Sequence, residues 1–236
     1  MKVDIWSDVR CPFCYIGKRK FEMALSRFPH KDEVEVVWHS FELDPDFKTN
    51  TRLNVYDYLA ERKGQSREWS VQMHEHVSKT AKEVGLEYHF DKAVLANSFN
   101  AHRLIQFAKS KGLGDAAKEA LLKAYFTEGK NMDDADTLIA IAASIGLDKE
   151  QTSDMLASGA FTAEVRNDEA MAAEIGINGV PFFVLDNKYA VSGAQSPDVF
   201  LGALQQAWAE YEAHKPQVII TDAGADVCDI NDKTNC

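Results

Sequence analysis

The fold of this chain is decided by the short stretch Cys11-Pro12-Phe13-Cys14. The alternating residues before it, from Val3 to Trp6, predict a short strand, and the apolar residues at helical spacing after it, from Tyr15 to Leu25, predict a helix. The two cysteines therefore stand where a strand ends and a helix begins. Proline is favoured in the first turn of a helix, because its missing N–H would have no intrahelical partner there.

The start of a helix favours an anion, because unpaired N–H groups and the helix dipole point toward it. We therefore expect the Cys11 thiol to ionise more readily than a free cysteine. The spacing lets Cys14 reach back to the sulfur of Cys11 and close a small disulfide ring. An exposed thiol of low pKa beside a second thiol is the arrangement that dithiol–disulfide exchange needs.

Two other interpretations of the cysteines are a zinc site and an inert buried pair. The chain has two more cysteines, Cys228 and Cys236, which could complete a zinc site. Structural zinc usually takes two tight cysteine knuckles, whereas seven residues separate this second pair. The strand–cysteine–helix context favours redox chemistry over both alternatives, and we predict no metal.

Composition and charge exclude several classes of protein. The 236 residues are enough for one large domain or two small ones, and 45% apolar and 27% charged residues are typical of a globular protein. A net charge of −11 without any basic run argues against a nucleic-acid partner. No apolar stretch has membrane-spanning length, and the N-terminus enters a strand without a secretory leader. We expect a cytoplasmic protein without a membrane partner.

The rest of the chain completes a strand–helix–strand unit and adds a helical block and a hairpin. A second strand, Val34 to Phe41, completes a strand–helix–strand unit with parallel strands. The block from Leu53 to Gly176 has helical periodicity without a credible strand. Its predicted helices are Val55–Arg62, Val71–Val84, Phe99–Lys109, Ala116–Thr127, Ala135–Ile145 and Ala163–Ile175. Two short strands, Val180–Leu185 and Tyr189–Val191, then form a hairpin before a last helix, Asp198–His214.

This order predicts an α/β protein with a thioredoxin-like fold and an inserted all-helical domain. We assign residues 1–52 and 177–214 to a discontinuous thioredoxin-like domain. Residues 53–176 form the helical insertion domain. Residues 215–236 form an acidic C-terminal tail that carries the second cysteine pair.

Four segments resemble the DsbA family, and its FrnE-like branch in particular. The segments are Asp8–Gly17 around the CPFC motif, Asn97–Arg103 in the helical block, Gly176–Val184 around Pro181, and Val191–Gln195. They occur in the family's order over most of the chain. The tail after Lys215 departs from the family pattern.

The resemblance implies a thiol–disulfide oxidoreductase that needs no dissociable cofactor. Cys11 would attack substrate disulfides and Cys14 would resolve the mixed disulfide. The Val180–Pro181 peptide bond would be cis and lie against the cysteines, with Pro12 and Phe13 completing the substrate-binding surface. Backbone groups of Val180 would then pair with an extended substrate. From the sequence alone, Pro181 is equally well an ordinary edge-strand proline.

Of the two residues between the cysteines, the one at position 13 is expected to tune the redox chemistry. A histidine there could donate charge and hydrogen bonds to the thiolate, but Phe13 cannot. We therefore expect a pair less oxidising than the strongest DsbA-type oxidants.

The expected partners are protein thiols and disulfides, with glutathione as a further candidate; the oligomeric state stays open. The chief rival is a glutathione-dependent enzyme of the kappa-class transferase or 2-hydroxychromene-2-carboxylate isomerase type. Those enzymes typically carry serine at the first cysteine position, whereas both cysteines are present here. A third alternative is a binding protein without turnover.

Two further groups of residues are candidates for chemistry. Cys228 and Cys236 form either a disulfide that staples the tail or an auxiliary redox pair that exchanges with Cys11 and Cys14. Histidines are candidate metal ligands by type, but His74 and His76 do not share a helix face. His102 is expected to be a hydrogen-bonded residue beside the core rather than a base.

Overall fold

The computed structural model describes residues 1–214. A four-stranded sheet has the order β2-β1-β3-β4. Its strands are β1 (Lys2–Ser7), β2 (Glu35–Ser40), β3 (Phe182–Leu185) and β4 (Tyr189–Ser192). Strand β2 pairs with β1 in parallel, whereas β3 pairs antiparallel with both β1 and β4. The α/β thioredoxin-like fold expected from the sequence is thereby confirmed.

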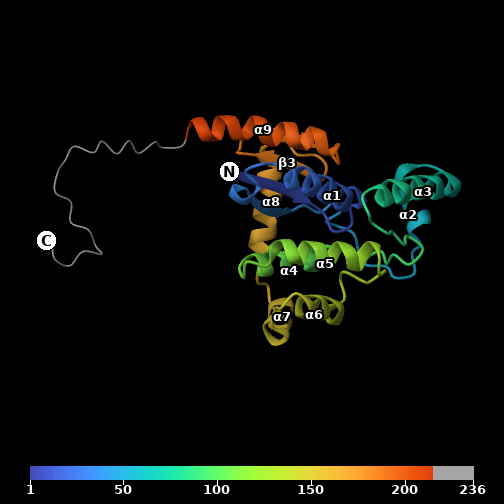
Figure 1. The fold of residues 1–236 in the computed structure, drawn as a ribbon. Helices are drawn as coiled ribbons and strands as arrows, with labels where there is room; N and C mark the ends of the chain where they lie inside the picture. Colours follow the sequence, from blue (N-terminus) through green and yellow to red (C-terminus); the bar gives the residue numbers. More distant parts are fainter. Residues whose placement is uncertain (215–236) are drawn as a thin grey trace, which may run out of the picture.

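Helices cover both faces of the sheet and fill the chain between β2 and β3 (Figure 1). They are α1 (Pro12–Ser26), α2 (Val55–Lys63), α3 (Arg67–Glu83), α4 (Phe99–Lys109), α5 (Gly114–Phe126), α6 (Ala135–Ser144), α7 (Lys149–Ala157), α8 (Thr162–Glu174) and α9 (Pro197–Ala213), with a short 3₁₀ helix at Lys31–Glu33. Within residues 1–214, no helix is long and apolar enough to span a bilayer.

Strand β1 sorts its side chains onto two faces by simple alternation. Val3 and Ile5 join the apolar core under α1 and α9, where the rings of Phe21, Phe183 and Phe200 pack together. Asp4 and Trp6 point to the other face of the sheet, on the side of α8. That opposite face therefore carries buried polar groups as well as apolar ones.

Helix α1 belongs to two cores. Phe21 and Ala24 pack in the core of the sheet, whereas Tyr15 and Ile16 pack in the larger core formed by the helical block. The helix that begins at the cysteine motif is therefore fixed from both sides.

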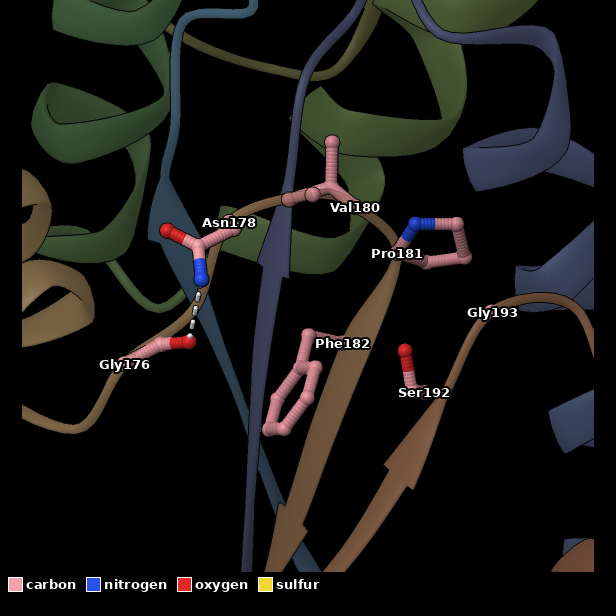
Figure 2. Close-up of a pocket in the computed structure, with 8 residues that line it drawn as sticks. Gly176, Asn178, Val180, Pro181, Phe182, Ser192 and Gly193 are labelled. Carbon is pink, nitrogen blue, oxygen red and sulfur yellow. Dashed lines mark hydrogen bonds between the residues drawn. The ribbon is translucent and has the colours of Figure 1, made fainter.

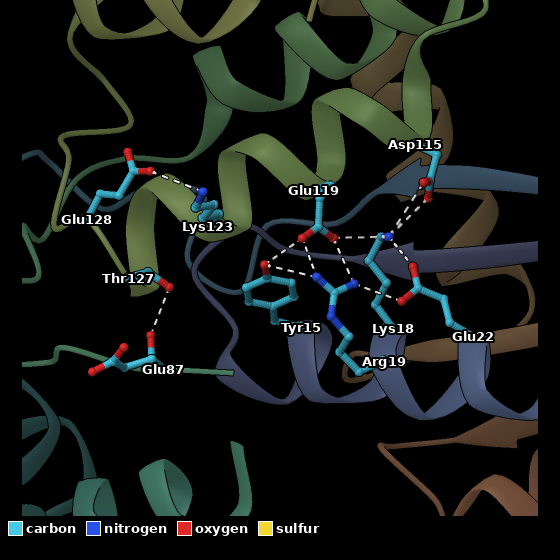
Figure 3. Close-up of polar contacts among 10 residues, drawn as sticks. All are labelled: Tyr15, Lys18, Arg19, Glu22, Glu87, Asp115, Glu119, Lys123, Thr127 and Glu128. Carbon is cyan, nitrogen blue, oxygen red and sulfur yellow. Dashed lines mark hydrogen bonds and ion pairs between the residues drawn. The ribbon is translucent and has the colours of Figure 1, made fainter. Parts of the chain in front are cut away.

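Figure 3 shows polar contacts that join α1 to α5. The ammonium of Lys18, whose side chain is only 3% exposed, lies 3.1 Å from a Glu119 oxygen and also pairs with Glu22. Arg19 pairs with both of these carboxylates, and Tyr15 donates a 2.6 Å hydrogen bond to Glu119. These contacts hold the helical block against the helix that carries Cys14.

A buried histidine joins the sheet to α8. His39 Nδ1 lies 2.7 Å from an Asp168 oxygen, and its Nε2 lies 2.6 Å from an Asp4 oxygen. The Trp6 ring stacks on the imidazole, at 4.4 Å between ring centroids. The other Asp168 oxygen accepts hydrogen bonds from Ser40 N and from Gln106 of α4. One carboxylate thus ties together β2, α4 and α8.

Most predicted elements are present, with shifted ends. Three residues lie between the paired Leu185 and Tyr189, and Lys188 N donates to the Leu185 carbonyl across a turn whose central residues, Asp186 and Asn187, have left-handed φ of 52° and 53°. Helix α3 begins four residues before the predicted Val71, after the Ser66 cap. Helix α7 was not predicted, because it buries only Thr152 and Met155 and so lacks an apolar stripe.

Candidate active site

The CPFC motif lies at the junction that the sequence predicts. Cys11 is the residue just before α1, Pro12 is the first residue of the helix, and Cys14 lies in its first turn. Cys11 and Cys14 are free thiols, 4% and 1% exposed. Phe13 is 41% exposed. The expectation of an exposed Cys11 thiol is wrong, because the segment before β3 covers its sulfur.

That covering segment contains Val180 and Pro181, whose peptide bond is cis. Cys11 Sγ lies 3.4 Å from the Val180 carbonyl oxygen and donates to it. Figure 2 shows Val180 and Pro181 on the stretch that enters β3, with Gly193 on the segment that follows the neighbouring strand β4. Gly193 N donates a 2.8 Å hydrogen bond to the Pro181 carbonyl. The resemblance to the DsbA family implies this meeting of two segments that lie about 170 residues apart in the chain.

Two cavities flank the motif. One, of about 400 Å³, is lined by the segment 176–182 with Ser192 and Gly193 (Figure 2). The other, of about 710 Å³, opens beside Cys11, Pro12 and Phe13. Its far wall is formed by α2, α3 and the segment up to Leu95, through side chains that include Tyr58, Leu59, Trp69, Met73, Val77 and Phe90. Apolar groups of a substrate can therefore be buried next to the sulfurs.

Gly17 lets the Pro181 ring pack directly on α1. A Cβ placed on Gly17 would lie 2.9 Å from Pro181 Cγ and 3.6 Å from the backbone of Ala194. A proline ring cannot swing away as a flexible side chain can. The absence of a side chain at position 17 therefore sets the distance between α1 and the Pro181 segment.

Gly17→Ala is expected to destabilise the protein by about 1–3 kcal/mol, the usual cost of forcing a methyl group into a packed site. It should also slow disulfide exchange, since the Pro181 segment must move relative to Cys11. Denaturant unfolding and insulin reduction measure the two effects. Gly202→Ala in α9 is the control, because nothing lies within 4 Å of its added Cβ. Equal stability of the two variants would contradict the close-packing argument.

The pKa values of Cys11 and Cys14 move in opposite directions from their ordinary values. The hydrogen bond with Cys14, then burial and the negative charges of Cys14 and Asp8, raise the pKa of Cys11 well above its ordinary value. Burial alone would raise the pKa of Cys14, but the hydrogen bond from Cys11 and the charge of Lys118 lower it. The expectation that Cys11 ionises more readily than a free cysteine is therefore not met in the reduced pair. The helix terminus acts on both sulfurs, and the positive charge of Lys118 also acts on Cys14.

Polar groups support the motif from beneath, and sequence reasoning missed most of them. Asp8 is fully buried, accepts hydrogen bonds from Leu43 N and Arg10 N, and lies 3.3 Å from His102 Nε2. Burial alone would raise the pKa of Asp8, but His102 and the two N–H groups lower it to about 2. His102 is thus a hydrogen-bonded core residue, as expected, and fixes a carboxylate near the sulfurs.

Two residues of the helical block contact the motif or the strand that leads to it. The Tyr88 hydroxyl donates a 2.7 Å hydrogen bond to the Pro12 carbonyl. Lys118 of α5, 1% exposed, donates a 3.0 Å hydrogen bond to the carbonyl of Ser7, the last residue of β1. Neither has a sequence signal, because a lysine in an amphipathic helix is usually solvated and a lone tyrosine is usually core.

Metal ligation has no support in the part of the chain that the structure describes. No group of three His, Cys, Asp or Glu side chains there could hold a metal ion. His74 Nδ1 donates a 2.7 Å hydrogen bond to the Ser70 carbonyl of its own helix, and His39 is enclosed by two carboxylates. The auxiliary pair, Cys228 and Cys236, lies outside the described residues.

Comparison with known proteins identifies the family. Residues 2–205 match the family described as "DSBA-like thioredoxin domain". The chain belongs to the DSBA-like thioredoxin domain family. The Cys11–Cys14 pair therefore stands at the active-site position of a DsbA-like oxidoreductase.

Individual members of this fold cover nearly the whole chain. The crystal structure of a probable DsbA oxidoreductase from Streptomyces coelicolor is 39% identical, with a TM-score of 0.84 over 98% of this chain and 97% of that one. The uncharacterized protein YwbO of Bacillus subtilis is 28% identical over 205 residues, 86% of this chain and 94% of YwbO. A 2-hydroxychromene-2-carboxylate isomerase shares the fold, at 15% identity and a TM-score of 0.64 over 92% of this chain and all of that one.

Proposed function

We propose that this chain exchanges disulfides with protein substrates, with Cys11 attacking and Cys14 resolving. The observation that carries the proposal is the position of Cys11 Sγ, beside Cys14 and 3.4 Å from the Val180 carbonyl. A peptide strand paired with the backbone of Val180 would bring its own sulfur to Cys11. Pro12, Phe13 and Pro181 surround this point and would contact the residues next to the substrate disulfide.

The exchange proceeds in steps that balance. In the singly ionised pair, the Cys11 thiolate attacks one substrate sulfur while Cys14 carries the remaining proton. The substrate S–S bond breaks as the Cys11–substrate bond forms, and the first substrate thiolate leaves. This leaving thiolate takes the proton from Cys14. The Cys14 thiolate then attacks the Cys11 sulfur of the mixed disulfide and releases the second substrate thiolate. The protein dithiol has lost two electrons, and the substrate disulfide has gained them.

The FrnE-like subtype and the cytoplasmic setting belong to the same proposal. The segments 97–103 and 176–184 support the subtype by their resemblance to that branch. In the cytoplasm, thiols are kept reduced, so the net direction would be reduction or isomerisation of substrate disulfides. Glutathione is a candidate electron donor, and neither nucleic acid nor membrane is a proposed partner.

The rival function is a glutathione-dependent isomerase or transferase. The cavity of about 710 Å³ beside Cys11 favours it, because that volume suits a small organic substrate. Two reduced cysteines in contact favour disulfide exchange instead. The deciding experiment compares insulin-disulfide reduction with glutathione conjugation of an electrophilic aromatic compound. Insulin reduction without conjugation supports the proposal, and conjugation without insulin reduction overturns it.

Phe13→His is expected to lower the pKa of the dithiol and to make the pair more oxidising. An imidazole between the cysteines adds a donor and a partial positive charge at the sulfurs, which favours the thiolate. The thiolate absorbance followed against pH measures the pKa, and equilibration with glutathione measures the potential. An unchanged pKa would show that the position 13 side chain does not act on the sulfurs. Phe13→Leu is the control, because it keeps the position apolar.

A further inference from the structure

A guanidinium lines the cavity beside the cysteines. Arg10 immediately precedes Cys11, and both residues line the cavity of about 710 Å³. The Arg10 side chain stacks on Phe47, with Cζ 4.3 Å from the ring centroid, and lies 5.9 Å from the centroid of the Tyr58 ring. These aromatic contacts fix the guanidinium on the wall of the cavity, next to the residue that attacks the substrate.

Stacking leaves the edge of this guanidinium available. A guanidinium is planar, so an aromatic ring covers its face while its N–H groups point outward in the plane. The Tyr125 hydroxyl takes a hydrogen bond from Arg10, and burial raises the pKa of Tyr125 while the Arg10 charge opposes that effect. One neutral hydroxyl does not use all the N–H donors and does not balance the charge. The remaining donors can therefore bind a ligand that enters the cavity.

No carboxylate within residues 1–214 forms an ion pair with the Arg10 guanidinium. Asp8, two residues earlier, is fully buried and accepts from backbone N–H groups, including that of Arg10, and lies against His102. Asp44, which also lines the cavity, is paired with Arg62. Both nearby carboxylates thus have partners of their own, and Arg10 is a cation that still lacks one.

The charges around the cavity favour an anion, although the chain as a whole carries −11. The charged residues that line it are Arg10, Arg62, Lys63 and Asp44. Because Arg62 is paired with Asp44, Arg10 and Lys63 are left without an opposite charge. His74 adds no charge at neutral pH, since burial lowers its pKa. Salt at about 0.15 M screens charges beyond about 8 Å, so an anion in the cavity responds to these local cations.

The rest of the wall is apolar, which decides what kind of anion fits. Leu59, Trp69, Met73 and Val77 are among the side chains that form it. An ion pair against an apolar wall is less weakened by water than one on an open surface. The wall also calls for an apolar side chain in the ligand. A peptide segment can carry both groups, whereas glutathione has carboxylates but no bulky apolar side chain.

We propose that Arg10 binds a carboxylate of the protein substrate beside the disulfide that Cys11 attacks, so that the protein prefers acidic segments with a bulky apolar side chain. This inference rests on the proposed function, since it names the substrate class of the same exchange. Arg10 contacts the substrate and takes no part in the transfer of electrons.

Strand geometry indicates where the carboxylate belongs in the substrate. A substrate strand that pairs with the backbone of Val180 has its alternate side chains on one face. The residues two places before and two places after the substrate cysteine therefore share a face with its sulfur. An acidic residue at one of these two places lies on the side of Cys11 and Arg10.

The test uses two peptides that differ only in charge. Each has blocked ends, leucines and one cysteine, with either glutamate or glutamine two places before and after that cysteine, which is joined by a disulfide to 2-thiopyridine. Attack by the Cys11 thiolate on the peptide sulfur forms the Cys11–peptide disulfide and releases the pyridine thione, whose absorbance gives the rate constant. Each rate constant is divided by that of dithiothreitol with the same peptide, because a nearby carboxylate repels any attacking thiolate.

The reduced parent is expected to prefer the glutamate peptide by about tenfold, the usual effect of one hydrogen bond to a charged group. Arg10→Gln should reduce this preference to about twofold, with the remainder due to Lys63, and Arg10→Glu should reverse it. Arg27→Gln is the matched control. It removes the same charge at the far end of α1, where Arg27 pairs with Asp198, and it should keep the parent's preference.

The outcomes separate this inference from the proposed function. Equal corrected rate constants for the two peptides in a parent that reduces insulin overturn the inference and leave the proposed function standing, as does a preference that survives in Arg10→Glu. If Arg10→Gln slows the reduction of oxidised glutathione but leaves the peptide preference unchanged, the guanidinium serves glutathione and the inference is wrong. If the parent neither releases the thione nor reduces insulin, the proposed function is wrong whatever Arg10 does.

Circular dichroism and the unfolding midpoint check that the Arg10 variants fold. If one of them does not fold, the other decides. If neither folds, the parent's own preference between the two peptides decides.

Discussion

Cys11→Ser is expected to reduce the rate of insulin-disulfide reduction to the uncatalysed level, a loss of about 10³-fold or more. A serine hydroxyl at this position has no accessible anion and cannot form a disulfide with the substrate. Its size is close to that of cysteine, so the packing against Val180 and Pro181 should survive. Circular dichroism and the unfolding midpoint of the variant check that the fold is retained.

Cys14→Ser should behave differently from Cys11→Ser. Attack by Cys11 remains, but no second thiol resolves the product, so mixed disulfides with substrate proteins should accumulate. The hydrogen bond to Cys14 is the largest cause that raises the pKa of Cys11, followed by burial and by the negative charge of Cys14, and the serine of this variant carries no such charge. Its Cys11 thiol should therefore ionise at a lower pH than in the parent. Mass spectrometry of the trapped adduct, digested to peptides, should place the substrate on Cys11.

Asp168→Ala is expected to lower the free energy of unfolding by about 3–5 kcal/mol, because it leaves buried partners without their acceptor. The Asp168 carboxylate accepts from the His39 imidazole, from Ser40 N and from the Gln106 amide. Asp198→Ala is the matched control. Asp198 is 81% exposed in its ion pair with Arg27, and such a pair contributes about 0–1 kcal/mol. Denaturant unfolding of both variants should separate them clearly, and equal losses would contradict the role assigned to Asp168.

The same cluster predicts how stability depends on pH. Burial alone would lower the pKa of His39, but its hydrogen bonds to Asp168 and Asp4 raise it above 6.5, despite opposition from Lys109. This contribution is therefore complete below pH 6.5 and is lost as the pH rises through the pKa of the folded protein. Burial alone would raise the pKa of Asp168 and Asp4, but the hydrogen bonds with His39 lower both below 3.8. Their contribution is complete above pH 3.8 and is lost as the pH falls.

The cluster should thus stabilise the protein most between about pH 4 and 6.5. Unfolding free energies measured from pH 4.5 to 9 should fall on the alkaline side in the parent. That decline should be reduced in His39→Gln, which cannot titrate. A parent whose stability rises steadily across this range would show that His39 is not held as a cation.

The sequence predicts the parts of this molecule that depend on local rules. The strand before Cys11, the helix that starts at Pro12 and the hairpin around Asp186 and Asn187 all follow from alternation, helical spacing and turn chemistry. Helix α7 does not, because its few buried residues leave no pattern.

The segment Asn97–Arg103 shows where local rules stop. Resemblance singles it out, and the structure supplies the physical reason. His102 meets Asp8 near the sulfurs, and the Arg103 guanidinium donates to the carbonyls of Met155, Ser158 and Ala160. Partners that lie more than fifty residues away have no signature in a single sequence.

The ionisation of the cysteines was mispredicted for a related reason. The sequence argument relied mainly on the helix terminus, which acts on Cys11 and Cys14 alike. What separates them is tertiary: the Val180 carbonyl accepts from Cys11, and Lys118 of the inserted helix acts on Cys14. Lys118 lies far from the motif in the sequence, and nothing in the residues around it indicates that its side chain is buried.

The most direct test of the central claim follows the electrons in a single turnover. The reduced parent protein is mixed with an equal amount of insulin, quenched in acid, alkylated and mapped by mass spectrometry. The account predicts that each insulin disulfide reduced is matched by one new Cys11–Cys14 disulfide. Insulin thiols that form while Cys11 and Cys14 are still alkylated as free thiols would contradict it.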